Sequence, residues 1–465
     1  MKRGVFIESG PMDWQILQQV DGKAEISLSG SWAFPDELKD HSVYARVVKE
    51  ESGGTVIPWT LCEETGPQQW RITLNDIPAG GLYRVETCLY HDLPFGERER
   101  AYEWYNRGDM IHHIGIGDLF IIAGQSNAVG YGKDPISDPP ELGVHLLRNS
   151  GKWDLATHPL NESTNTVHEA NLEGGNPGTS PYLNFAKLLK KELGYPIGLL
   201  QSALGGTAFC YWDPYEDGYL YKNMVEVIRS VGSKIKGVLW DQGSGDTIEG
   251  ARDTYLERFM RMVTHLREEL KDPGIHVLTG QLHCLRTLST EDEDIGWGKI
   301  KEAQRQAARQ IPYVYVLPNS DGTLSDAIHY SSSHNLVLGE RLAKTALKHI
   351  YGKNIRWDAP DLDEAKKTSP DSVTLKFSNV FGRLYTIEAT EKTISFFVED
   401  EDGLVGLSEY IIKAPDTIML KLTRNIRGKC RVHGCYQKTP KELMPKDFET
   451  HLPVLSFYGV DITEN

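Results

Sequence analysis

The sequence contains no stretch of about 20 apolar residues, the length that a membrane-spanning helix requires. No apolar segment follows its basic first residues, so we expect no secretory signal. The six cysteines are scattered and form no dense framework, which favours reduced thiols and a cytoplasmic protein. The net charge of −15 argues against a surface for nucleic acid or for an anionic membrane.

Complete metal-binding motifs are absent as well. His112-His113 and the group Cys430, His433 and Cys435 do not provide a full tetrahedral set of ligands at the usual spacing. We therefore expect neither a metal nor an organic cofactor.

The 465 residues are too many for one hydrophobic core, so two or three domains are expected. Residues 1–112 and residues 354–465 show short alternating runs separated by turn signals, a pattern typical of β-sandwiches. Residues 113–353 instead alternate buried strands with amphipathic helices. This middle region predicts a doubly wound, flavodoxin-like α/β domain with a mostly parallel sheet.

Apolar runs predict the strands of that sheet at residues 119–123, 197–200, 238–240, 275–279 and 313–317. Helical periodicity predicts helices at residues 182–193, 255–270, 297–310 and 334–350. The connection 127–178 shows little periodicity, and a loop of that length predicts a functional segment beside the site. The acidic runs 291–294 and 399–402 are expected in solvated loops.

Chemically useful residues follow several of these strands. Ser126 comes just after the first strand, Gln242 just after the third, and Asp326 and His329 after the fifth. In open α/β sheets such positions surround one crevice at the carboxyl edge. A serine hydroxyl needs a base, which His329 can provide, and Asp326 can orient the histidine ring. The pattern therefore predicts acyl transfer.

A tetrahedral intermediate also needs hydrogen-bond donors for its oxyanion. The backbone N–H of Ser126, a glycine N–H at 205 or 206 and the Gln242 amide are the predicted donors. Tyr211 and Tyr215 flank Trp212, and stacking on a sugar ring and buried packing both remain open for these aromatic rings. The further residues predicted to bind substrate are Gln125, Asn127, Gly206 and Trp212.

The motif around the serine does not match the nucleophile elbow of α/β-hydrolases. That motif has a glycine on each side of the serine, and Ala128 stands where the second glycine is required. The chain order Ser, Asp, His would fit that class, but the missing glycine argues against it.

The blocks Gly124-Gln-Ser-Asn, Gly205-Gly-Thr, Trp240-x-Gln-Gly and Asp326-x-x-His together resemble the sialate O-acetylesterase-like carbohydrate esterases. These belong to the SGNH (GDSL-like) hydrolases. The resemblance implies Ser126 as nucleophile, His329 as base and Asp326 as its orienting residue, with Gly205 and Gln242 as oxyanion donors. The chain departs from the family in having Ser244 where an acidic residue often follows the Gln-Gly pair. This departure bears on the bracing of the loop and on substrate preference.

We therefore expect an esterase that removes acetyl groups from acetylated carbohydrates, such as xylo-oligosaccharides, sialic acids or pectin fragments. Two alternatives remain: a carbohydrate-binding protein without activity, and an esterase for short acyl groups on compounds other than sugars. The sugar, the acetylated position and a homo-oligomeric state are left open by the sequence.

Overall fold

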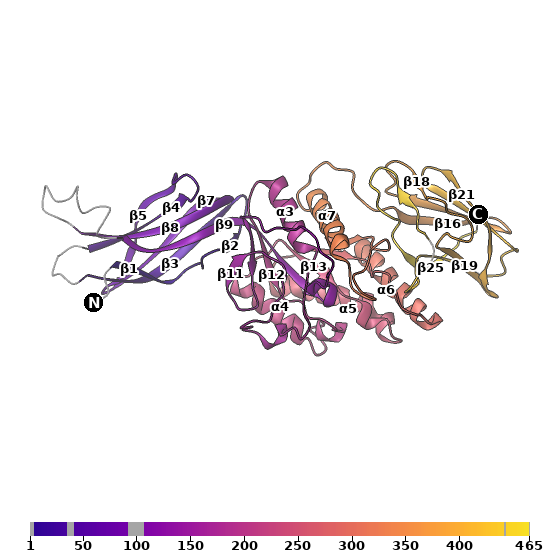
Figure 1. Cartoon of the computed structure of the whole chain (residues 1–465), viewed down its shortest axis with the longest axis horizontal. Helices are drawn as coiled ribbons and strands as arrows, with labels where there is room; N and C mark the ends of the chain where they lie inside the picture. The colour runs from indigo at the N-terminus through magenta and orange to yellow at the C-terminus, as the bar shows by residue number, and fades with distance from the viewer. Residues whose placement is uncertain (1–3, 35–40, 92–106, 441–442, 465) are drawn as a thin grey trace.

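The computed structural model of the protein describes residues 4–34, 41–91, 107–440 and 443–464. Three parts follow one another along its long axis: two β parts at the ends and an α/β part between them (Figure 1). The chain termini lie at opposite ends of the molecule. No helix in the described ranges has the length and apolarity needed to cross a membrane.

The N-terminal part is built from two antiparallel sheets around a buried core that includes Trp70, Tyr83 and Val85. One sheet has the order β1 (Gly4–Ser9), β3 (Lys23–Ala33), β7 (Gln69–Pro78), β6 (Glu63–Gly66). The other joins β5 (Thr55–Leu61), β4 (His41–Lys49), β8 (Gly80–His91) and the first half of β9 (Arg107–Gly124). The short β2 (Ile16–Gln18) pairs in parallel with β9.

The strand β9 connects the N-terminal part to the central part without a break. Its first half pairs with β8, and its second half, from Asp118 onward, lies at the centre of the α/β sheet. The domain boundary predicted at residues 112–113 therefore lies inside a strand, and the three-domain division stays a prediction.

The central sheet confirms the predicted doubly wound α/β fold. Its order is β11 (Trp153–Leu155), β10 (Val144–Leu147), β12 (Ile197–Gln201), β9, β13 (Gly237–Asp241), β14 (His276–Gly280), β15 (Val314–Leu317). All pairings are parallel except that of β10 with β11. The residues of β9 that are paired here are fully buried, as the continuous apolar run predicted.

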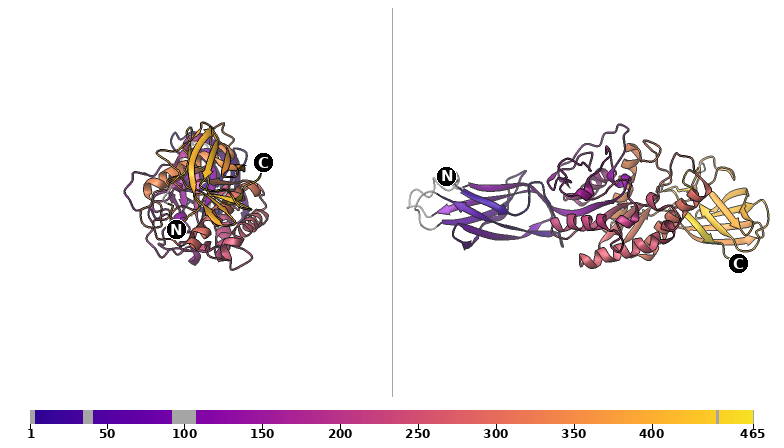
Figure 2. Two further views of the ribbon diagram at one scale, coloured as in Figure 1. Left: turned by 90° about the vertical axis from the view of Figure 1, so that its right-hand side faces the viewer. Right: turned by 90° about the horizontal axis from the view of Figure 1, so that it is seen from below.

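Helices cover both faces of this sheet (Figures 1 and 2). The helices α3 (Tyr182–Leu193) and α7 (Ser332–His349) pack on one face. The other face is covered by α4 (Tyr219–Ser230), α5 (Ala251–Glu269) and α6 (Glu291–Gln310). Helix α3 ends at Gly194, whose φ of 79° is the left-handed conformation that favours glycine at a helix C-terminus.

Strands β10 and β11 and helix α4 were not predicted from the sequence. The two strands have four and three residues, too short for a clear alternation, and they lie in the connection expected to be a loop. Helix α4 buries residues such as Met224 and Ile228.

The acidic run 291–294 is the first turn of α6 and not a loop, so that prediction was wrong. Thr290 caps this helix: its hydroxyl accepts a hydrogen bond from the Glu293 N–H at 3.3 Å. Acidic residues at a helix N-terminus are stabilised by the helix dipole, which a count of charges does not reveal. The second acidic run, 399–402, begins inside β19 (Phe396–Asp400), and Asp400 is buried against Arg424.

The C-terminal part again contains two four-stranded antiparallel sheets. One has the order β16 (Asp361–Ser369), β17 (Ser372–Ser378), β22 (Thr417–Leu422), β21 (Leu407–Ala414). The other has the order β20 (Gly403–Val405), β19, β23 (Arg431–Gly434), β25 (Phe457–Asp461). A short pair, β18 (Leu384–Tyr385) and β24 (Lys446–Asp447), completes this part. Phe377, Phe396 and Phe457 pack in its core, as expected of a β-sandwich-like domain.

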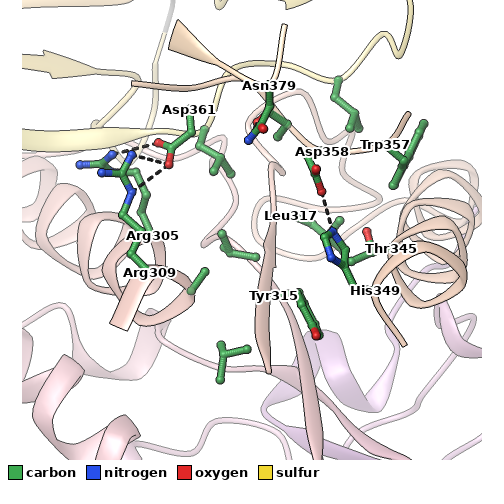
Figure 3. Close-up of a pocket in the computed structure, with 16 residues that line it drawn as sticks. Arg305, Arg309, Tyr315, Leu317, Thr345, His349, Trp357, Asp358, Asp361 and Asn379 are labelled. Carbon is green, nitrogen blue, oxygen red and sulfur yellow. Dashed lines mark hydrogen bonds and ion pairs between the residues drawn. The ribbon is translucent and has the colours of Figure 1, made fainter. Parts of the chain in front are cut away.

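A cavity of about 260 Å³ lies where the C-terminal part meets α6, β15 and α7 (Figure 3). Arg305 and Arg309 at its wall pair with Asp361, and His349 pairs with Asp358. None of the predicted site residues lines this cavity. Its charged groups are used to join the two parts of the protein.

Candidate active site

Ser126 lies at the first turn that follows the central strand β9. Gly124 ends the strand with a φ of 128°, and a Cβ there would lie 2.1 Å from the Asp241 carbonyl oxygen. Only glycine allows the two strand ends to approach this closely. Ser126 begins the short helix α2 (Ser126–Val129), so its N–H has no partner within the helix. Its side chain is partly exposed, whereas both of its neighbours in sequence are buried.

His329 and Asp326 lie in the loop between β15 and α7 and form a pair. The Nδ1 of His329 lies 2.8 Å from Oδ2 of Asp326, whose other oxygen accepts the His329 N–H at 2.7 Å and the Ile328 N–H at 2.8 Å. Burial by itself would raise the pKa of Asp326, but the hydrogen bonds from His329 and the backbone lower it. Asp326 is therefore ionised at neutral pH and can stabilise a protonated His329.

The serine turn and the histidine loop are joined by direct contacts. The Tyr330 N–H donates to Oδ1 of Asn127 at 3.2 Å, so Ser126 and His329 are each adjacent in sequence to one member of a bonded pair. The ring of Tyr131 stacks on that of His329 with centroids 4.7 Å apart. No hydrogen bond joins the Ser126 hydroxyl to His329 in the described part of the chain, and such bonds often form only when substrate is bound.

A buried network of polar side chains around Tyr330 adjoins these loops. The Tyr330 hydroxyl donates to Asp241 at 3.1 Å and accepts from Asn319 at 2.5 Å, and Asn319 is 2.6 Å from the His334 ring. Burial raises the pKa of Asp241 to about 7, although the bond from Tyr330 acts in the opposite direction. This network was not predicted from the sequence, because its residues belong to separate segments of the chain.

On the other side of Ser126, the Gly205 N–H already has a partner. It donates to Oε2 of Glu173 at 2.8 Å. A Cβ on Gly205 would lie 2.9 Å from that oxygen, so the close approach depends on glycine. The predicted oxyanion donor is therefore covered by a carboxylate in this structure.

The side chain of Gln242 also has partners within the protein. The sequence had predicted it as a donor facing the crevice. Its side-chain nitrogen lies 2.6 Å from Asp246 and 3.3 Å from the Thr207 carbonyl oxygen, and the residue is 1% exposed. Both acceptors lie within the protein, so the amide braces the loop after β13. A role for Gln242 as an oxyanion donor stays a prediction. It requires the amide to give up its longer hydrogen bond, to the Thr207 carbonyl oxygen, and to donate to the oxyanion instead.

The same loop explains what replaces the acidic residue that the family often has. The Ser244 hydroxyl accepts a hydrogen bond from the side-chain amide of Gln125, and the carbonyl oxygen of that amide accepts the Gly243 N–H at 3.2 Å. Asp246 accepts from Gln242 and from the Phe209 N–H at 2.8 Å. Burial raises the pKa of Asp246, and these hydrogen bonds partly offset the increase.

Trp212 is not a substrate-binding residue in this structure, so that prediction was wrong. It is 0% exposed, packs edge-on against Trp240 at 5.2 Å, and donates its indole N–H to the Thr207 hydroxyl at 3.3 Å. Gln125 and Asn127 are likewise buried and use their side chains within the protein. Gly206 is exposed, and its role in binding stays a prediction.

Two residues of the long connection border the site and were missed by the sequence reasoning. They are Tyr131, which stacks on His329, and Glu173, which covers Gly205. The length of the connection predicted a functional segment, but no local pattern identified these two side chains.

A serine follows the central strand of the parallel sheet and a histidine–aspartate pair follows its last strand, an arrangement suited to acyl transfer through a serine. The family model described as carbohydrate esterase, sialic acid-specific acetylesterase, matches residues 116–348, half of the chain. The protein belongs to this family of carbohydrate acetylesterases.

Solved structures extend the likeness beyond the central part. A carbohydrate acetylesterase from Xanthomonas citri is similar over 96% of this chain and 97% of its own, with a TM-score of 0.64 and 20% identity. This likeness concerns the fold and includes both β parts. A protein from Arabidopsis thaliana is 26% identical over 50% of this chain and 98% of its own, with a TM-score of 0.43. The chain matches none of the curated proteins.

Proposed function

We propose that the protein removes acetyl groups from acetylated sugars or oligosaccharides through an acyl-serine intermediate. Ser126 is the nucleophile, His329 the general base and Asp326 the residue that orients the base. The observation that carries this proposal is the 2.8 Å His329–Asp326 pair on a loop that is bonded, through Tyr330, to the residue after Ser126.

In the proposed reaction, the Ser126 oxygen attacks the acetyl carbonyl carbon while His329 takes the hydroxyl proton. The negative charge that develops on the carbonyl oxygen is held by the N–H groups of Ser126 and Gly205 and by the Gln242 amide. When the intermediate collapses, His329 returns the proton to the departing sugar oxygen. Water, activated by the same histidine, then attacks the acyl-serine and releases acetate.

The substrate class is part of the proposal. The matching family model is described as sialic acid-specific, and acetylated xylo-oligosaccharides and pectin fragments contain the same ester chemistry. A cytoplasmic location is also proposed, and it favours small sugars and oligosaccharides over intact polymers.

The test is turnover of 4-nitrophenyl acetate, followed by acetate release from a panel of acetylated sugars. An organophosphate should label the peptide that contains Ser126 and abolish activity, and Ser126→Ala should be inactive. Ser137→Ala is a matched control, because Ser137 is exposed on the neighbouring connection. Lack of turnover of any acetyl ester, or labelling of another serine with Ser126→Ala still active, would contradict the proposal.

A further inference from the structure

The carboxylate of Glu173 occupies the N–H of Gly205, which is one of the proposed oxyanion donors. Its Oε2 accepts the Gly205 N–H at 2.8 Å, and its Oε1 accepts the Tyr131 hydroxyl and the Gly175 N–H, each at 2.9 Å. Among the described residues this carboxylate therefore meets only neutral donors. It can move away from Gly205 without breaking an ion pair.

The backbone around Glu173 is held in place. The Glu173 N–H donates to the Ser163 hydroxyl at 2.7 Å, and that hydroxyl donates to the Glu173 carbonyl oxygen at 3.0 Å. On the opposite side, a Cβ on Gly175 would lie 1.9 Å from the Tyr131 hydroxyl oxygen, so the loop packs closely against this ring. The side chain of Glu173 is therefore aimed at Gly205 by a fixed backbone.

This arrangement conflicts with catalysis. One N–H cannot serve the Glu173 carboxylate and an oxyanion at full strength, and a carboxylate beside the oxyanion would repel the developing charge. Glu173 must release Gly205 before the reaction can proceed. Glu173 is partly exposed in the free protein, but a bound substrate excludes water from the site, so an Oε2 that leaves Gly205 then needs a donor on the substrate.

We propose that Glu173 determines specificity by exchanging the Gly205 N–H for a hydroxyl group of the substrate. The side chain pivots about Oε1, which stays bonded to Tyr131 and Gly175, while Oε2 turns to a sugar hydroxyl. An ester with a free hydroxyl near the acetyl group assists this exchange, and an ester without one does not. The inference rests on the proposed function and extends it, since it selects partly acetylated sugars over fully acetylated sugars and simple acetates.

The test compares a monoacetylated methyl xyloside, which has free hydroxyls, with its fully acetylated form, which has none. In Glu173→Ala we expect kcat/KM for the fully acetylated form to rise about tenfold, because a charge-assisted hydrogen bond no longer has to be broken. The monoacetylated form should be hydrolysed less well, so the preference for it falls. Glu169→Ala is the matched control, because Glu169 is an exposed acidic residue of the same connection.

Glu173→Gln guards against misfolding, because it keeps the side-chain shape while weakening the bond to Gly205. It should shift the preference in the same direction by a smaller factor. An unchanged ratio between the two xylosides in both variants would overturn the inference, as would an equal loss for both substrates with a lower melting temperature. Wild-type protein that hydrolyses no acetyl ester would instead defeat the proposed function.

Discussion

The two halves of the proposed active site differ in how ready they are for the reaction. In the triad half, which consists of Ser126, Asp326 and His329, Ser126 is partly exposed and His329 is already paired with Asp326. In the oxyanion half, which consists of the proposed donors Gly205 and Gln242, the Gly205 N–H is covered by Glu173 and the Gln242 amide is held by Asp246.

The difference follows from when each charge exists. Asp326 is ionised in the resting protein, so it can orient His329 before any substrate arrives. The oxyanion exists only during the reaction, and a buried donor left without an acceptor is costly. The proposed donors of the oxyanion half therefore have other acceptors in the free protein, and under the proposed function they exchange them during turnover.

The largest effect on activity is expected in the triad half. Ser126→Ala and His329→Ala should each lower kcat/KM for 4-nitrophenyl acetate by about 10⁴-fold or more, as in other catalytic triads. Steady-state rates and melting temperatures would check this. Asp326→Asn should lose less activity, because the His329 ring is also held by stacking on Tyr131. Near-native rates for Ser126→Ala would show that another residue is the nucleophile.

The next effect concerns Asp241, which ends β13 and belongs to the buried network around Tyr330. The pKa of Asp241 is raised to about 7 in the folded protein from an unfolded value near 3.8, so the folded state holds the proton more tightly. Stability from this group is greatest below pH 3.8 and is lost as the pH rises toward 7. In wild type, the free energy of unfolding should fall by up to about 4 kcal/mol over this range because of Asp241, and Asp241→Asn should abolish that fall.

Urea unfolding of wild type and Asp241→Asn at several pH values would measure that loss. The difference in unfolding free energy between the two proteins should grow from pH 4 to pH 7 and then stay constant. A difference that is independent of pH would mean that Asp241 titrates normally.

Substitution of Gln242 tests whether the oxyanion half rearranges during the reaction. Gln242→Ala should lower kcat by about 10²–10³-fold with little change in KM, because an oxyanion donor acts only in the transition state. Asp246→Asn is the control: it weakens the brace but keeps the amide, so it should lower the melting temperature with a smaller loss of kcat. Near-native kcat in Gln242→Ala with reduced stability would leave the glutamine with bracing alone.

The smallest effect is expected for the stacking of Tyr131 on His329. Tyr131→Phe keeps the ring against His329, so kcat/KM for 4-nitrophenyl acetate should stay within about threefold of wild type. Tyr131→Leu removes the stacking and should lower kcat/KM by about two- to tenfold. Equal rates for the two variants would show that stacking does not position His329.

The central strands and the histidine–aspartate pair were predictable because their signals are local. The run from Leu119 to Ala123 is apolar throughout since both faces of the sheet are covered. Asp326 and His329 are three residues apart, so one turn of chain brings them together. In the structure, the hydrogen bond from Tyr330 to Asn127 brings that turn next to Ser126.

The sequence by itself determined five strands of the central sheet, the place of Ser126 after the central strand and the Asp326–His329 pair, since hydrophobic periodicity and short spacings specify them. The tertiary structure decided that Trp212 is buried, that Gln242 binds Asp246 and that Glu173 covers Gly205. The physical reason is that a polar side chain bonds to whichever donor or acceptor reaches it. Glu173 and Gly205 are 32 residues apart, and only the folded connection after β9 brings them into contact.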